Sequence, residues 1–119
     1  MKFAIAIENT EKSMELLDMF FEKMKFCPHF TLDVFTVQEA EGQERGIEEL
    51  KKKVMKKLEL KKIKGEFIVG KGDPAFKVSY LIKKRQIDIF VAYYEHTLFR
   101  TSFFEKVIKE TDVPIIVLR

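Results

Sequence analysis

Two patterns of hydrophobic and polar positions alternate along this chain. Short runs rich in β-branched and aromatic residues predict strands at 3–7, 30–37, 66–69, 87–93 and 114–118. The segments between them carry apolar residues three or four positions apart, a spacing that predicts helices with one apolar face. The residues that mark these four faces are Met14, Leu17, Phe21 and Met24, then Ile47, Leu50, Val54 and Leu58, then Ala75, Val78 and Ile82, then Phe103, Phe104, Val107 and Ile108.

Strict alternation of strand and helix indicates right-handed crossover connections, which make the strands parallel. The first and fourth runs are almost continuously apolar, as expected when helices cover both faces of a sheet. We therefore predict a three-layer α/β/α fold, a five-stranded parallel sheet with two helices on each face. The 119 residues suit a single domain, 1–119. The Gln-, Glu- and Gly-rich stretch 38–46 is predicted to be a surface loop.

The starts of three helices have recognisable chemistry. Asp73 can cap the third helix, Pro74 suits its first position, and Gly72 permits the turn before it. The other candidate caps are Asn9, Thr10 and the weaker Ser13 for the first helix, and Thr101 or Ser102 for the last, with Glu105 completing a capping box.

The amino-acid composition predicts a packed core and a cytoplasmic location. Apolar residues make up 46% of the chain and charged residues 34%, and twelve Phe with no Trp make Phe the main large core residue. The net charge of +3 is too small to indicate nucleic-acid binding by itself. Cys27, the single cysteine, fits a reducing cytoplasm. We expect no signal peptide and no membrane span, and the abundance of Lys, Glu, Ile and Phe suggests a thermophilic source.

Ligands of open parallel α/β sheets bind beyond the carboxyl ends of the strands, here at 7–10, 37–39, 70–73 and 92–102. Glu8 could accept hydrogen bonds from a ligand amine or ribose hydroxyl, or be a solvated carboxylate near a helix start. Gly70 to Asp73 could contact a phosphate, although a structural turn and cap also explain these residues.

The loop at 92–102 is the most unusual segment. His96, Arg100, Thr101 and Ser102 could surround an anion, and Tyr93 and Tyr94 could stack on a ring. Alternatively, its aromatic residues pack in the core or an interface. The lysine cluster at 51–64 is interpreted as a solvated helix face. Cys27 and His29 lack metal-ligand spacing, and no nucleophile–base pair or carboxylate pair indicates an enzyme.

Several segments, taken in order and spacing, resemble the universal stress protein family over essentially the whole chain. They are 3–8 with Ser13, Gly72-Asp73-Pro74-Ala75, 87–92, 103–108 and 112–118. The resemblance implies the sheet order 3-2-1-4-5 of the adenine nucleotide alpha hydrolase-like fold. It also implies a cytoplasmic, usually dimeric protein linked to survival under stress. Some members of the family bind ATP and others do not.

The resemblance also implies a candidate nucleotide site. Glu8 falls at the position of the family's acidic residue, and Val37 at the position of a backbone contact to adenine. Tyr93 falls where the phosphate loop has its first glycine, and Thr101-Ser102 at the final Gly-Ser/Thr of that loop. The candidate set is Ile7, Glu8, Val37, Gly72, Tyr93, Thr101 and Ser102.

The loop of this chain lacks all the glycines of that pattern and is about five residues shorter. We therefore expect ATP binding to be weak or lost, with no cofactor required, in a non-catalytic interaction protein. The alternative is an ATP-binding universal stress protein. We expect a homodimer through the last strand, Pro114 to Leu118. In this apolar run only Pro114 would hinder pairing with a strand of another chain. Other protein partners are unknown, and neither a membrane nor a nucleic acid is expected as a partner.

Overall fold

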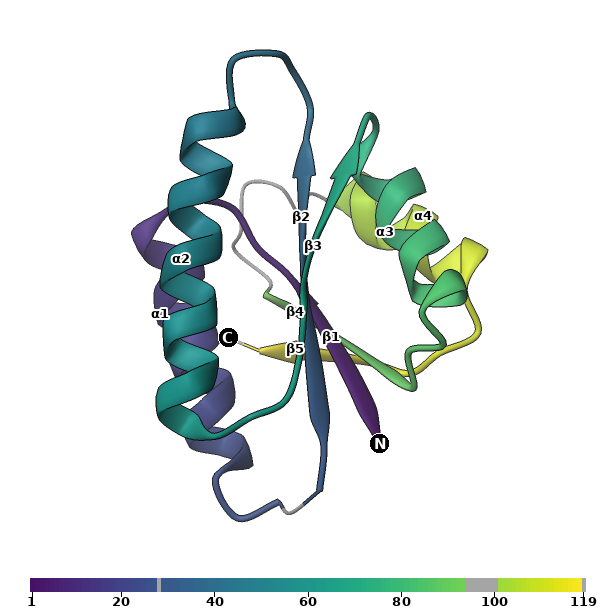
Figure 1. Ribbon diagram of the computed structural model, residues 1–119. Helices are drawn as coiled ribbons and strands as arrows, with labels where there is room; N and C mark the ends of the chain where they lie inside the picture. The colour runs from purple at the N-terminus through teal and green to yellow at the C-terminus, as the bar shows by residue number, and fades with distance from the viewer. Residues whose placement is uncertain (28, 94–100, 119) are drawn as a thin grey trace.

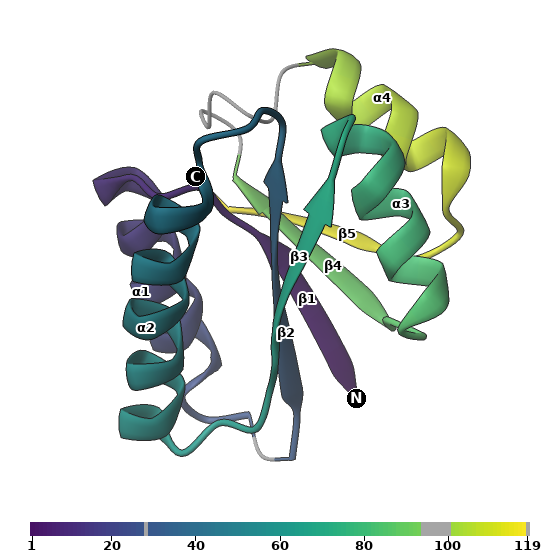
Figure 2. The ribbon, with the colours of Figure 1, turned by 45° about the horizontal axis from the view of Figure 1, so that its top comes forward.

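The structure is a computed structural model that describes residues 1–27, 29–93 and 101–118 (Figure 1). Its elements alternate as predicted: β1 (Lys2–Ala6), α1 (Glu11–Met24), β2 (Thr31–Gln38), α2 (Glu44–Lys61), β3 (Phe67–Lys71), α3 (Pro74–Lys84), β4 (Ile89–Tyr93), α4 (Thr101–Glu110) and β5 (Ile115–Leu118). The strands pair in parallel in the order β3-β2-β1-β4-β5. Helices α1 and α2 cover one face of the sheet, and α3 and α4 cover the other (Figure 2). The predicted α/β/α fold and strand order are confirmed.

The core has two layers because side chains alternate between the faces of each strand. In β1, Phe3 and Ile5 join the cluster under α1 and α2, whereas Ala4 and Ala6 join the cluster under α3 and α4. Phenylalanines are the largest fully buried side chains, as predicted. Across the described part of the chain, no helix has the length and apolar character needed to cross a membrane.

The helix faces differ in detail from the predicted stripes. Helix α1 buries Leu16, Leu17, Phe20 and Phe21, whereas Met14 and Met24 are only partly buried. Ile108 of α4 was predicted on the apolar stripe but is exposed. A spacing of three or four residues places a side chain near the buried face, but the orientation of the helix on the sheet decides which edge of that stripe remains in water.

The loop between β2 and α2 is shorter than predicted, because β2 continues to Gln38 and α2 already begins at Glu44. The Gln38 amide donates to Glu44 Oε1 at 3.0 Å, which ties the end of the strand to the first turn of the helix. Gln43 Oε1 accepts hydrogen bonds from the backbone N–H groups of Glu39 and Ala40. These polar side chains therefore organise the connection itself.

Two predicted helix caps are confirmed. Thr10 Oγ1 accepts the backbone N–H of Ser13 at 3.1 Å at the start of α1. Asp73 Oδ2 accepts the N–H of Phe76 at 3.0 Å at the start of α3. Gly72 adopts a φ of 114°, a conformation that side chains resist. The predicted caps of α4, Thr101 and Ser102, have side chains that lie outside the described part of the structure.

Replacing Asp73 by alanine is expected to lower the free energy of unfolding by about 0.5–2 kcal/mol, because an N–H of the first turn of α3 loses its acceptor. Urea unfolding monitored by circular dichroism measures the loss. Asp73→Asn is the matched control, since asparagine is an equally good cap and should keep most of the stability. An asparagine variant as unstable as the alanine variant would contradict the capping role.

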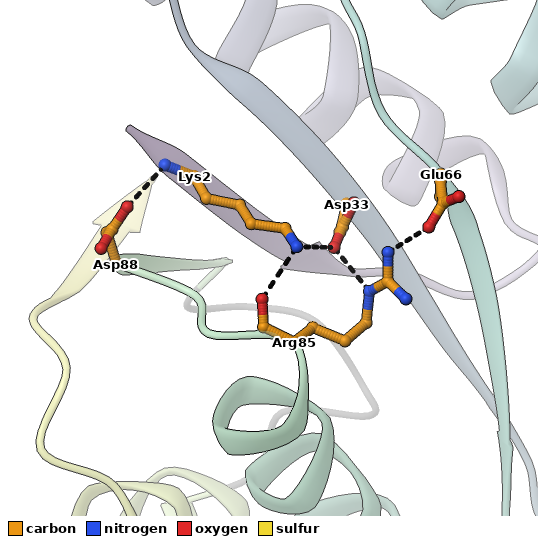
Figure 3. A network of polar contacts seen from close by, with 5 residues as sticks. All are labelled: Lys2, Asp33, Glu66, Arg85 and Asp88. Carbon is orange, nitrogen blue, oxygen red and sulfur yellow. Dashed lines mark hydrogen bonds and ion pairs between the residues drawn. The ribbon is translucent and has the colours of Figure 1, made fainter.

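A charged network lies at the end of the sheet where the parallel strands begin (Figure 3). Asp33 of β2 is only 2% exposed, and its Oδ2 accepts a hydrogen bond from Arg85 Nε at 2.7 Å. Arg85 also pairs with Glu66, and Lys2 Nζ lies 3.5 Å from Asp33 Oδ2. The hydrogen bond to Asp33 is the main reason that the pKa of Arg85 is raised above its ordinary value. The network links β1, β2, the approach to β3 and the end of α3.

Candidate functional site

A cleft of about 460 Å³ opens at the carboxyl ends of β1 and β2, beside the start of α2. The sequence predicted a site at this edge of the sheet. Two predicted residues, Glu8 and Val37, line the cleft together. The other lining residues are Asn9, Thr10, Thr36, Glu39, Gly42, Gln43, Gly46, Ile47 and Leu50.

Buried hydroxyl groups hold the end of β1 in place beside this cleft. The backbone N–H of Ile7 donates to Phe35 O at 2.9 Å, and Thr36 Oγ1 donates to Ile7 O at 2.8 Å. Ser13, buried on α1, accepts the backbone N–H of Glu8 at 2.9 Å through its Oγ. These bonds set the position from which the half-buried Glu8 reaches the cleft.

The connection between β2 and α2 builds the opposite wall. Asn9 Nδ2 donates to Gly46 O at 3.3 Å, so the first turn of α2 is tied to the segment that follows β1. At the end of the wall, Glu44 accepts hydrogen bonds from its own backbone N–H and from the Gln38 amide, which hold its pKa below the ordinary value.

The cleft combines an acidic rim with an apolar floor. Its described lining includes two carboxylates, Glu8 and Glu39, but no lysine or arginine. Val37, Ile47 and Leu50 contribute apolar surface. Such a cleft can accept hydrogen bonds from amine and hydroxyl donors on a small, partly apolar ligand. Glu8 and Glu39 disfavour a phosphate group placed beside them.

The remaining predicted site residues lie around the cleft or outside the described residues. The Ile7 side chain is buried in the core, and its backbone groups are bonded to Phe35 and Thr36. Gly72 adjoins the end of β2, where its N–H donates to Gln38 O at 3.1 Å. The side chains of Tyr93, Thr101 and Ser102 lie outside the described part of the structure, as does the whole segment 94–100 with His96 and Arg100.

The sequence did not single out Thr36, which lines the cleft, or Gln38, which lies outside the cleft lining but within the expected segment 37–39. Both are polar residues within a strand whose other buried members are mostly apolar, and both are buried. That contrast is the signal that could have revealed them, because a buried polar side chain needs a hydrogen-bond partner. Within residues 1–27, 29–93 and 101–118, no group of three or more His, Cys, Asp or Glu side chains could hold a metal ion.

The chain is thus a three-layer α/β/α domain with a parallel sheet between two pairs of helices and a cleft at the ends of β1 and β2. The chain has the fold of the universal stress proteins, as solved structures show. No protein-family model matches the sequence, and no curated protein matches it at a significant level.

Three solved structures illustrate the likeness. A universal stress protein family member from Arabidopsis thaliana with AMP bound superposes with a TM-score of 0.81 at 14% identity, over 98% of this chain and 90% of that one. A family protein from Burkholderia pseudomallei has a TM-score of 0.76 at 13% identity, over 98% and 94%. A universal stress protein in complex with cAMP has a TM-score of 0.76 at 10% identity, over 99% and 95%.

Proposed function

We propose that this chain is a non-catalytic, universal-stress-protein-like protein of the cytoplasm that acts in stress response through protein contacts. In this proposal it works as a homodimer and binds ATP weakly or not at all. The observation that carries the expectation of weak ATP binding is the charge of the cleft. Its described lining includes two glutamates and no cation.

The electrostatic argument follows from the chemistry of ATP. A triphosphate carries several negative charges, which are stabilised in proteins by lysine, arginine, metal ions or clusters of backbone N–H groups. Glu8 and Glu39 oppose such charges in the cleft. The sequence of the loop after β4 points the same way. Together with Tyr93, the last residue of β4, it contains no glycine and includes Tyr94 and Phe99, whereas glycines let backbone N–H groups approach a phosphate.

A second candidate is an adenine-nucleotide-binding protein. Glu8 and Val37, from two different strand ends, line the same cleft, and the resemblance assigns both to an adenosine site. The structures with AMP and with cAMP show that proteins of this fold bind adenine nucleotides. If this chain binds adenine nucleotides, contacts with the adenosine part of the nucleotide must provide most of the binding energy.

Isothermal titration with adenosine, AMP and ATP, with and without magnesium, distinguishes the two candidates. Under our proposal the dissociation constant for ATP is weaker than about 100 µM, and adding phosphates to adenosine does not tighten binding. A constant for ATP in the low micromolar range would overturn this part of the proposal and favour the second candidate. Glu8→Gln would then weaken binding, whereas Glu41→Gln, outside the cleft lining, would not.

The proposed homodimer pairs two copies along β5, an edge strand of the sheet. Ile116 and Val117 alternate between the faces of the sheet, and both are exposed. No charged residue interrupts 115–118 to discourage pairing with another strand. Exposed Ile108 adds apolar surface on α4, the helix that precedes this strand.

A further inference from the structure

The solvent-facing side of α3 has an unusual composition. Ala75, Val78, Leu81 and Ile82 pack into the core, so the other side of the helix faces solvent (Figures 1 and 2). There Phe76 is 65% exposed and Tyr80 is 47% exposed, one helical turn apart. We define the α3 surface as Phe76, Lys77, Tyr80, Lys83 and Lys84. The helix contains no aspartate or glutamate, so this surface consists only of aromatic and cationic side chains.

The aromatic and cationic side chains contact one another. Lys77 Nζ lies 5.9 Å from the ring centroid of Phe76 and 5.6 Å from that of Tyr80. Lys84 Nζ lies 5.5 Å from the centroid of Tyr80. Both rings therefore have an ammonium group over a face, while much of their apolar surface remains exposed.

The lysines of the α3 surface differ from those of α2 in their surroundings. Helix α2 also contains four glutamates, three of them before its first lysine, and Lys57 pairs with Asp18 of α1 at 2.8 Å. Among the ion pairs of the described residues, none joins Lys77, Lys83 or Lys84 to a carboxylate. Within the described residues, the positive charge of the α3 surface is thus not paired with a carboxylate.

We propose that the α3 surface binds an acidic protein segment that also carries apolar side chains. Carboxylates of the segment pair with the lysines, and its apolar side chains cover Phe76 and Tyr80. A single-stranded nucleic acid fits less well, because bases stack on open ring faces and each of these rings has an ammonium group over at least one face. This inference rests on the proposed function and specifies the chemistry of one partner.

The surface is also compatible with the proposed dimer. Helix α3 packs against β2 and β3, and β3 is the edge strand opposite to β5. A dimer formed through β5 would therefore leave the α3 surface accessible in both copies.

Fluorescence anisotropy of the full chain with labelled twelve-residue peptides tests the inference. The first peptide alternates Asp or Glu with Leu, the second replaces Leu by Ser at equal charge, and the third replaces the acids by Lys. We expect the first peptide alone to bind, with a dissociation constant of tens of micromolar that weakens as salt rises. Lys77→Glu/Lys84→Glu and Phe76→Ser/Tyr80→Ser should each weaken binding by about tenfold or more.

Helix α2 supplies the matched controls, since Lys52, Lys56 and Leu60 are exposed there. Lys52→Glu/Lys56→Glu makes the same change in charge, and Leu60→Ser removes an exposed apolar side chain; both variants should bind the first peptide normally. Three results would overturn the inference: no binding of the first peptide, equal binding of the second, or equal loss in the α2 controls.

A polythymidine oligonucleotide and phosphatidylserine vesicles are tested against the same variants. Tighter binding of either, lost with the α3 variants and kept with the α2 controls, would also overturn the inference. Failure of peptide binding alone would leave the dimer and the ATP titration unaffected, so the proposed function is tested separately.

Discussion

Replacing Arg85 by alanine is expected to lower the free energy of unfolding by about 3 kcal/mol. The side chain donates to the carboxylate of Asp33, which is buried in β2 (Figure 3). Without the guanidinium, the only cation that the described residues leave beside this buried negative charge is Lys2, whose Nζ lies 3.5 Å away on a partly exposed side chain. Uncompensated buried charge is among the most destabilising results of a single substitution. Urea unfolding measured at neutral pH gives the change.

A double variant tests whether the unpaired buried charge causes the loss of stability. Asp33→Leu/Arg85→Met is expected to be more stable than Arg85→Ala, because removing both charges leaves neither unpaired. Lys57→Ala is the surface control. It breaks the ion pair with exposed Asp18 and should cost less than about 1 kcal/mol. Equal losses of unfolding free energy for Arg85→Ala and Lys57→Ala would contradict the prediction. They would show that the burial of Asp33 does not increase the cost of losing its ion pair.

Replacing Ile116 by lysine is expected to convert the proposed homodimer into monomers. Ile116 is 40% exposed on the edge strand β5, and a lysine there would place two like charges near the two-fold axis of a β5–β5 interface. The shift should exceed tenfold in the dissociation constant of the dimer, because apolar contact is lost and repulsion is added. Light scattering and analytical ultracentrifugation at micromolar concentration measure it.

The other edge strand provides the matched control. Val69 of β3 is also 40% exposed, so Val69→Lys introduces the same charge at an equally exposed edge. This variant should remain dimeric. An unmodified chain that is already monomeric would refute the proposed dimer, and a Val69→Lys variant that dissociates instead would place the interface on β3.

The order of strands and helices was available from the sequence alone. Strand residues alternate with period two and helix residues with period 3.6, and both periods depend only on local backbone geometry. The caps at Thr10 and Asp73 could be predicted for the same reason, because a cap bonds a backbone N–H three residues away. The edge at which a ligand cleft forms follows from parallel connectivity, which the alternation implies.

The sequence could not show which partners the buried polar residues would meet. Asp33 and Arg85 are 52 positions apart in the sequence, and each taken alone would be predicted to be an ordinary surface charge. They meet because the register of β2 beside β1 and the position at which α3 ends place them at one end of the sheet. Likewise, Thr36 and Gln38 gain their roles at the cleft only when the ends of β1 and β2 and the start of α2 come together.

The sequence by itself therefore determined the elements, their order and the class of fold, since these follow from short-range periodicity and from the handedness of crossover connections. The tertiary structure alone decided the charged network, the acidic lining of the cleft and the exposed aromatic pair on α3. Each of these depends on how a helix is rotated on the sheet or on how strands are registered. Helix rotation and strand register are set by packing between segments that are distant in sequence. A local sequence pattern does not predict that packing.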